Sequence, residues 1–251
     1  MTKRMLRAVV LAGSLAVLAA VPLGAAAVRT IATIVLDTWF DGSFHAKIED
    51  VTLVGILPTV TLEARVSRED APGWHGWQVG LGPVVNLTPN LYLVALYNLG
   101  VDSDAVFSHE IDASLNHETA TTAVSLGLKA DWFPSTGYWY LTPSLGGKFH
   151  PVDALGLFGK VFVAVDGDEV SGSFWGEADW RVTPAIAVRA GGTMGYSGGF
   201  GWSAIAGVNV AITPRVLLKY TFKYLAEPVD ALPGAPVKNG IENGIVLDVR
   251  F

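Results

Sequence analysis

The sequence predicts an all-β fold in which consecutive antiparallel strands close into a transmembrane barrel. Three observations predict it: polar and apolar residues alternate in many segments, the hydrophobic residues are dispersed, and proline-containing turns separate pairs of segments. The chain is 51% hydrophobic with a mean hydropathy of +0.40. After Val28, however, no apolar stretch approaches the roughly 18 residues that a membrane-spanning helix needs. Strands with one face toward lipid and the other toward a lumen explain both properties.

The first 27 residues have the pattern of a secretory signal peptide. Basic residues precede an apolar run and a small-residue ending: Lys3, Arg4 and Arg7, then 8–21, then Ala25 to Ala27. We expect cleavage after Ala27, which leaves 28–251 as the barrel domain. An uncleaved anchor helix is the alternative, but Pro22 and the A-x-A ending favour removal.

Alternation is clear in twelve segments, although in 91–99 both faces are apolar. In 123–133, for example, Val124 and Leu126 fall on one face while Ser125 and Lys129 fall on the other. The twelve segments are 59–68, 76–87, 91–99, 107–116, 123–133, 137–149, 157–166, 171–182, 185–196, 202–212, 215–225 and the terminal strand that includes 245–251. An even number is required of a bacterial single-chain barrel, and twelve meets that requirement.

Residues 28–57 allow two interpretations. They supply one more hairpin, 31–40 and 44–54 across Asp41-Gly42, which makes fourteen strands, or they form a periplasmic or lumen-plugging segment before a barrel of twelve. Because the alternation breaks at Asp50, the pattern slightly favours twelve strands.

Short turns with proline recur between pairs of segments, at 88–90, 150–152, 183–184 and 213–214. Proline cannot donate to a strand ladder, so it belongs in turns. Counting backward from the terminal strand puts all four turns at one end of the barrel, which we expect to be periplasmic. The longer connections, of which 226–240 is the longest, then fall at the other end.

The last seven residues alternate as one strand. One face carries Ile245, Leu247, Val249 and Phe251, and the other carries Val246, Asp248 and Arg250. This ending resembles the carboxy-terminal assembly signal of Gram-negative outer-membrane β-barrel proteins. The resemblance implies a location in the bacterial outer membrane, in contact with its lipid. It also implies assembly by periplasmic chaperones and the barrel-assembly machinery and, commonly, porin-like passive transport of small polar solutes.

Composition excludes several classes of function. The chain has no cysteine, so disulfides, thiol chemistry and a lipoprotein anchor are excluded. Loss of the three basic residues of the signal peptide leaves 14 basic against 23 acidic residues, a net charge of −9. Such a charge disfavours nucleic acid as a partner. No motif calls for a cofactor.

The charged residues on the polar faces predict how the lumen is lined, because ionisable groups at membrane depth face the interior. A basic wall is predicted on late strands, and acidic groups are predicted elsewhere: Arg189, Arg215, Lys219 and Lys223, against Glu110, Asp112, Glu177 and Asp179. Segregated charges would set a transverse field across an open pore. The alternative is that these charges pair across a narrow lumen and close it. We expect a channel for small polar or charged solutes.

The sequence motifs and residue spacings give little support to an enzymatic site or a metal site. Gly195-Tyr196-Ser197-Gly198-Gly199 matches G-x-S-x-G, but that motif requires a strand-to-helix elbow and here lies between two strands. His109 and His117 are separated by about 26 Å of extended chain, too far to share one ion. We therefore predict neither a catalytic nor a metal site. An outer-membrane lipid hydrolase or acyltransferase, and a structural or adhesive barrel with a closed lumen, are the alternative functions.

Overall fold

The computed structural model describes residues 28–39, 44–71, 73–167, 169–196, 200–226 and 240–250. These residues form fourteen antiparallel strands in a closed barrel. The strands are β1 (Val28–Trp39), β2 (Phe44–Leu57), β3 (Val60–Ala71), β4 (Trp74–Thr88), β5 (Leu91–Asp102), β6 (Phe107–Glu118), β7 (Thr122–Phe133), β8 (Tyr138–Val152), β9 (Leu155–Asp166), β10 (Glu169–Arg181), β11 (Ile186–Tyr196), β12 (Phe200–Thr213), β13 (Val216–Ala226) and β14 (Gly240–Arg250).

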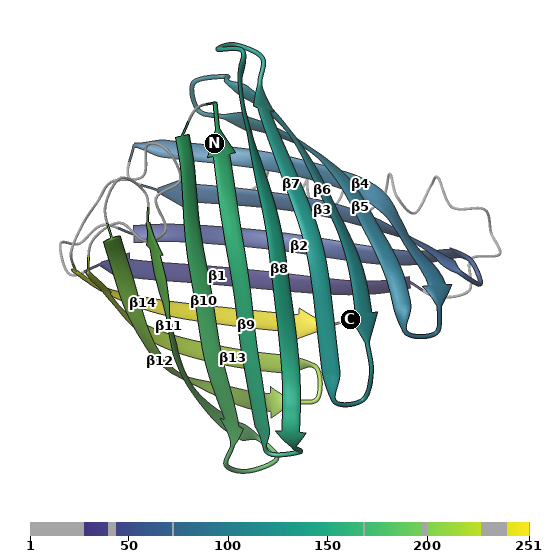
Figure 1. Cartoon of the computed structure of the whole chain (residues 1–251), viewed down its shortest axis with the longest axis vertical. Helices are drawn as coiled ribbons and strands as arrows, with labels where there is room; N and C mark the ends of the chain where they lie inside the picture. The colour runs from purple at the N-terminus through teal and green to yellow at the C-terminus, as the bar shows by residue number, and fades with distance from the viewer. Residues whose placement is uncertain are drawn as a thin grey trace.

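Each strand pairs with its neighbours in sequence, and β1 closes the ring by pairing with β14. At this seam Val35 lies opposite Val246, and Leu36 lies opposite Ile245. In Figure 1, β8, β9 and β10 lie nearly vertically on the near side of the barrel, while β1, β2 and β14 lie nearly horizontally behind them. Such tilted strands are expected of a closed barrel. Within the described residues no helix is long and apolar enough to cross a membrane.

The outer face of the barrel is apolar, as the alternation predicts. Side chains such as Leu126, Leu145 and Val161 are 59%, 55% and 45% exposed, while their neighbours in sequence point inward. Buried polar groups instead lie on the inner face, among them Asn98 and Asp131. The barrel is therefore organised as a transmembrane barrel is, with lipid-facing apolar residues outside and polar residues inside.

The turns at one end of the barrel contain two to four residues each: 58–59, 89–90, 119–121, 153–154, 182–185 and 214–215. We call this the short-turn end, and the opposite end, which includes 103–106 and 134–137, the loop end. The predicted turns at Pro89, Pro184 and Pro214 lie at the short-turn end. The turn predicted at 150–152 is displaced to 153–154, because a register shift between Phe149 and Val152 accommodates Pro151 within β8. Most of 226–240 lies outside the described residues.

The favoured count of twelve strands is corrected to fourteen, the alternative that the sequence left open. Residues 28–57 supply the extra hairpin, β1 and β2, which forms part of the wall. Asp50 is opposite Ala32 and Val66, so it keeps the period of two but puts an acid in an apolar register. That single residue is why the pattern there was ambiguous. The predicted signal peptide and Phe251 lie outside the described residues.

Candidate functional site: the charged walls of the lumen

The inner faces of β2 to β7 carry a dense set of charged residues, which we call the acidic wall. Seven carboxylates and three cations belong to it: Glu49, Glu63, Glu69, Asp102, Glu110, Asp112 and Asp131, with Lys47, Arg65 and Lys129. Strand alternation turns each of them inward, and the register places them next to one another. The excess of carboxylates gives this arc of the lumen a negative charge.

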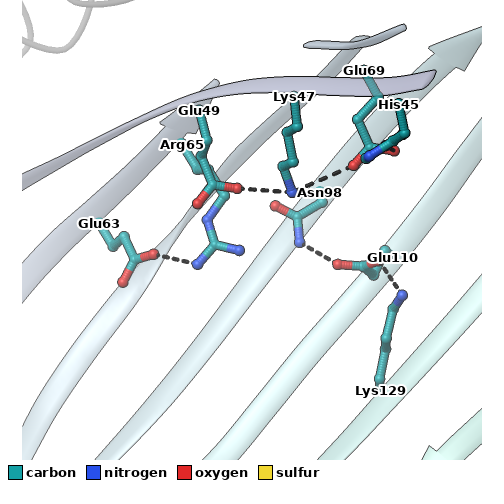
Figure 2. A network of polar contacts seen from close by, with 9 residues as sticks. All are labelled: His45, Lys47, Glu49, Glu63, Arg65, Glu69, Asn98, Glu110 and Lys129. Carbon is teal, nitrogen blue, oxygen red and sulfur yellow. Dashed lines mark hydrogen bonds and ion pairs between the residues drawn. The ribbon is translucent and has the colours of Figure 1, made fainter. Parts of the chain in front are cut away.

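On β2 and β3, Lys47 bridges two carboxylates. Its Nζ lies 3.1 Å from Oε2 of Glu49 and 3.4 Å from Oε1 of Glu69, and Lys47 and Glu69 are direct cross-strand partners. His45 Nε2 lies 3.6 Å from the other oxygen of Glu69. Figure 2 shows these groups in one row along the two strands. The lysine thus joins two strands through charge.

Glycines on β4 make room for this network. Arg65 donates to Glu63 at 2.9 Å, and the residue opposite Arg65 on β4 is Gly80. A Cβ at Gly80 would lie 1.9 Å from Oδ1 of Asn98 and 3.4 Å from Cβ of Arg65. No larger residue fits without displacing Asn98. At Gly80 the inner surface of β4 is therefore backbone, over which the side chains of Arg65 and Asn98 extend.

A second chain of contacts runs through β5, β6 and β7. Fully buried Asn98 donates its Nδ2 to Oε1 of Glu110 at 2.7 Å. The other oxygen of Glu110 accepts from Lys129 at 2.8 Å, and Lys129 also lies 3.5 Å from Asp131. Asp131 is only 6% exposed. These contacts join β5, β6 and β7 into a connected part of the wall, of which Figure 2 shows Asn98, Glu110 and Lys129.

A cavity of about 460 Å³ lies against the acidic wall toward the loop end. Its lining includes Glu69, Asp102, Glu110 and Asp112. Trp74 also lines it, and a Cβ at Gly76 would lie 2.8 Å from the Trp74 ring, so the ring covers Gly76. The cavity offers carboxylates and an aromatic surface to whatever enters the lumen from that end.

The predicted basic wall is divided by the structure. Arg189 lies on β11 and Lys219 and Lys223 lie on β13, but Arg215 is in the turn at 214–215 and is exposed at the short-turn end. Arg189 Nη1 lies 3.4 Å from Oε1 of Glu177, and Nη2 of the same guanidinium donates to the hydroxyl of Thr221.

Acidic and basic groups meet on these late strands. Lys219 Nζ lies 2.7 Å from Oδ2 of Asp248, and Asp179 is the cross-strand partner of Arg189. Glu177 and Asp179 are therefore brought together with Arg189 and are not segregated from it. Glu110 and Asp112, in contrast, lie in the acidic wall on β6. The charge of β10 to β14 is mixed for this reason.

Several members of the acidic wall were not among the site residues predicted from the sequence. Lys129, Glu63 and Arg65 fall on polar faces of clear strands, so alternation is the signal that places them inside. Lys47 and Glu49 lie in the segment whose fold was left open. Asn98 and Glu69 had no signal of their own, because only the register shows that they meet charged partners.

The residues considered for chemistry lie apart. His109 faces outward, where its Nδ1 is 2.6 Å from the hydroxyl of Tyr97 and its ring is 5.0 Å from that of Trp132. Gly195 and Tyr196 end β11, while 197–199 lie outside the described residues. In the part of the chain that the structure describes, no group of three or more His, Asp or Glu residues is arranged to hold a metal ion.

Comparison with known proteins gives a fold but no sequence family. No protein-family model matches the chain, and no curated protein matches its sequence. Among solved structures, the outer membrane protein Omp33 of Acinetobacter baumannii is 13% identical, with a TM-score of 0.57 over 89% of this chain and 98% of that one. The chain has the fold of outer-membrane porins and channels.

Two more porin-like structures support this assignment. The COG4313 outer membrane channel from Pseudomonas putida F1 is 12% identical, with a TM-score of 0.54 over 92% of this chain and 97% of that chain. The KdgM porin is 8% identical, with a TM-score of 0.50 over 88% of this chain and 99% of that chain. The chain also aligns with CdiB from Acinetobacter baumannii (8% identity, TM-score 0.55, 89% of this chain) and spans 60% of that chain's length. At these identities the likeness concerns the fold alone.

Proposed function

We propose that this porin-like barrel is a channel for the passive diffusion of small polar or charged solutes across the bacterial outer membrane. The observation that carries the proposal is the closed ring of fourteen strands, apolar outside and charged inside. A lumen lined by ion pairs and amides offers hydrogen bonds to water and to polar solutes at a depth where lipid offers none.

The size of the ring supports an open lumen. Fourteen strands spaced about 4.8 Å apart and tilted about 40° enclose a circle roughly 28 Å across between backbones. Among the described residues, every connection is a turn of two to four residues, so none of them folds back into this space. The hairpin of β1 and β2 widens the ring and does not plug it.

The acidic wall supports charge preference as part of the same function. Its three cations each contact at least one carboxylate of the same wall, so the carboxylates in excess determine its charge. Charges at a water-filled constriction select ions by sign. A cationic solute is attracted along β2 to β7, and an anionic solute is repelled from them.

The proposal includes membrane placement. Ile245 is 45% exposed on the outer face of β14, in register with outward Tyr220 of β13. Leu247 and Val249 share that face. We propose that this strand contacts outer-membrane lipid in the mature protein and is the segment that the barrel-assembly machinery and periplasmic chaperones recognise before insertion.

Single-channel recording of the refolded protein in a planar bilayer tests the channel. We expect step-like, ohmic current. Ser144 faces inward and its neighbour Leu145 faces outward, so Ser144→Trp and Leu145→Trp add the same ring to opposite faces of β8. We expect Ser144→Trp to lower the conductance and Leu145→Trp to leave it unchanged. No current from the refolded wild type, or an equal loss in both variants, would refute a lumenal path.

A further inference from the structure

Two lysines on β8 and β9 differ from five other lumenal cations. Lys47, Arg65, Lys129, Arg189 and Lys219 each lie within 4.0 Å of a carboxylate. Within the described residues, no carboxylate lies that close to Lys148 or Lys160, which both face the lumen. An anion can therefore bind these two ammonium groups without displacing an internal partner. We call this arc of the lumen the lysine wall.

The register explains why the two lysines have no acidic partner. Lys148 lies opposite Phe158, and Lys160 lies opposite Gly146 on one side and Trp175 on the other. Two carboxylates lie two strands away from Lys148 in register. Glu177, across Phe158, pairs with Arg189 instead, and Glu118, across Ala123, forms no ion pair with Lys148. Aromatic rings and glycine thus occupy the positions that hold carboxylates in the acidic wall.

Glycines let both lysine side chains lie across the neighbouring strand. A Cβ at Gly146 of β8 would lie 3.2 Å from Cγ of Lys160, and a Cβ at Gly156 of β9 would lie 3.7 Å from Cε of Lys148. Both side chains line a cavity of about 280 Å³ toward the short-turn end, together with Tyr92, Asn116, Ser125 and Phe158. Glu118 also lines this cavity but forms no ion pair with either lysine.

Aromatic rings form a surface beside the lysines. Phe158 and Trp175 meet edge to face with their centroids 4.9 Å apart, and the Nζ of Lys160 lies 4.6 Å from the centroid of Phe162. Edge-to-face rings offer flat apolar area to a ligand, and an ammonium over a ring is held in place by the ring quadrupole. The arrangement combines positive charge with a surface for a planar group.

We propose that Lys148 and Lys160 form a binding step for a small carboxylate on a flat apolar body, such as an aromatic acid, within the channel. The carboxylate is held by the two ammonium groups, and the planar body lies against Phe158 and Trp175. This step rests on the proposed channel function, since the solute reaches the site through the lumen. It gives the lysine wall a role opposite to that of the acidic wall.

Benzoate is the probe, and calorimetric titration of the refolded barrel in detergent measures its binding without requiring conductance. We expect Lys148→Gln with Lys160→Gln to weaken benzoate binding at least fivefold. The matched control is Lys219→Gln, which also removes one lumenal lysine but one already paired with Asp248, and which we expect to change binding less than twofold. No binding to the wild type, or equal loss in the control, would overturn the site.

Acetate and inorganic phosphate separate the parts of the proposal. We expect benzoate to bind more tightly than acetate or phosphate, and Phe158→Leu to weaken benzoate but not acetate. Equal affinity for the three anions would overturn the role of the flat body. A barrel that binds benzoate but carries no current would refute the channel and leave the site standing. A barrel that conducts but binds no benzoate would refute the lysine site and leave the channel standing.

Discussion

The acidic wall and the lysine wall are neighbouring arcs of one lumen, yet their lysines have different surroundings. Lys129 on β7 lies opposite Asp112 and contacts Glu110 and Asp131. Lys160, two strands further on, lies opposite a glycine and a tryptophan. The residue type is the same, and both positions face inward by the same alternation. Cross-strand register therefore decides whether a lumenal lysine is part of the wall or available to a solute.

The largest expected difference between the two walls is in stability. Lys129→Met leaves Glu110 and buried Asp131 without their cation. We expect this to cost about 2 kcal/mol, between the values for an exposed and a buried ion pair, because the Lys129 side chain is partly exposed. Lys160→Met removes a charge that has no carboxylate partner and only a cation–π contact with Phe162, and we expect a cost of less than about 1 kcal/mol. Urea unfolding in lipid vesicles, followed by tryptophan fluorescence, compares the two. Equal destabilisation would mean that the walls do not differ in internal pairing.

A smaller effect tests the space that glycine leaves in the acidic wall, with a glycine on the outward face of β8 as the control. Gly80→Ala places a Cβ against Oδ1 of Asn98 and disturbs its bond to Glu110, at a cost of about 1–2 kcal/mol for overpacking. The control is Gly147→Ala on β8, where a Cβ would meet only the carbonyl oxygen of Ala123 at 3.5 Å. The same unfolding measurement applies. A tolerated Gly80→Ala would show that the acidic wall is not closely packed there.

The smallest effect in energy is on ion selectivity. A unit charge roughly 8 Å from the ion path in water changes an ion's energy by about 0.5 kcal/mol. At 0.1 M salt, screening about halves this energy, and each charge acts with opposite sign on potassium and on chloride. Glu49→Gln with Asp112→Asn should therefore shift the potassium-to-chloride permeability ratio about fivefold toward chloride. Lys148→Gln with Lys160→Gln should shift it as far toward potassium. Reversal potentials under a salt gradient measure both shifts.

Salt provides the control for these shifts. The screening length falls from about 10 Å at 0.1 M to about 3 Å at 1 M salt, so both shifts should shrink at the higher concentration. Shifts of the same sign from the two double variants would contradict the opposite roles of the walls. Shifts that persist unchanged at 1 M salt would show that the substitutions alter the shape of the lumen and not its field.

Much of the barrel was predictable because strand alternation is a local property. The segment 123–133 was assigned from its own residues, and β7 occupies 122–133. The hairpin of β1 and β2 was not settled, since Asp50 disturbs the apolar face and only closure against β14 shows that residues 28–57 belong to the ring. In β5 the inner residues Val94 and Leu96 are apolar, so the two faces look alike in sequence although Leu96 is buried.

The lumenal site was predictable only in part. Glu110, Asp112, Glu177, Asp179, Arg189 and Lys219 were placed on inner faces by alternation, and their strands have those positions inside. Their partners were not predictable. The ion pairs of Arg189 with Glu177 and of Lys219 with Asp248 join residues on different strands, whereas alternation within single strands predicts only that Arg189 and Lys219 face inward.

By itself the sequence determined that this protein is an all-β transmembrane barrel, which end carries the proline turns, and which face is polar in the strands that alternate clearly. These properties follow from a period of two within each strand and from the turn preference of proline. Only the tertiary structure decided that there are fourteen strands among the described residues, that Lys47 and Lys129 are held by carboxylates, and that Lys148 and Lys160 are not. The physical reason is that register between strands is set by closure of the whole ring, which no single strand encodes.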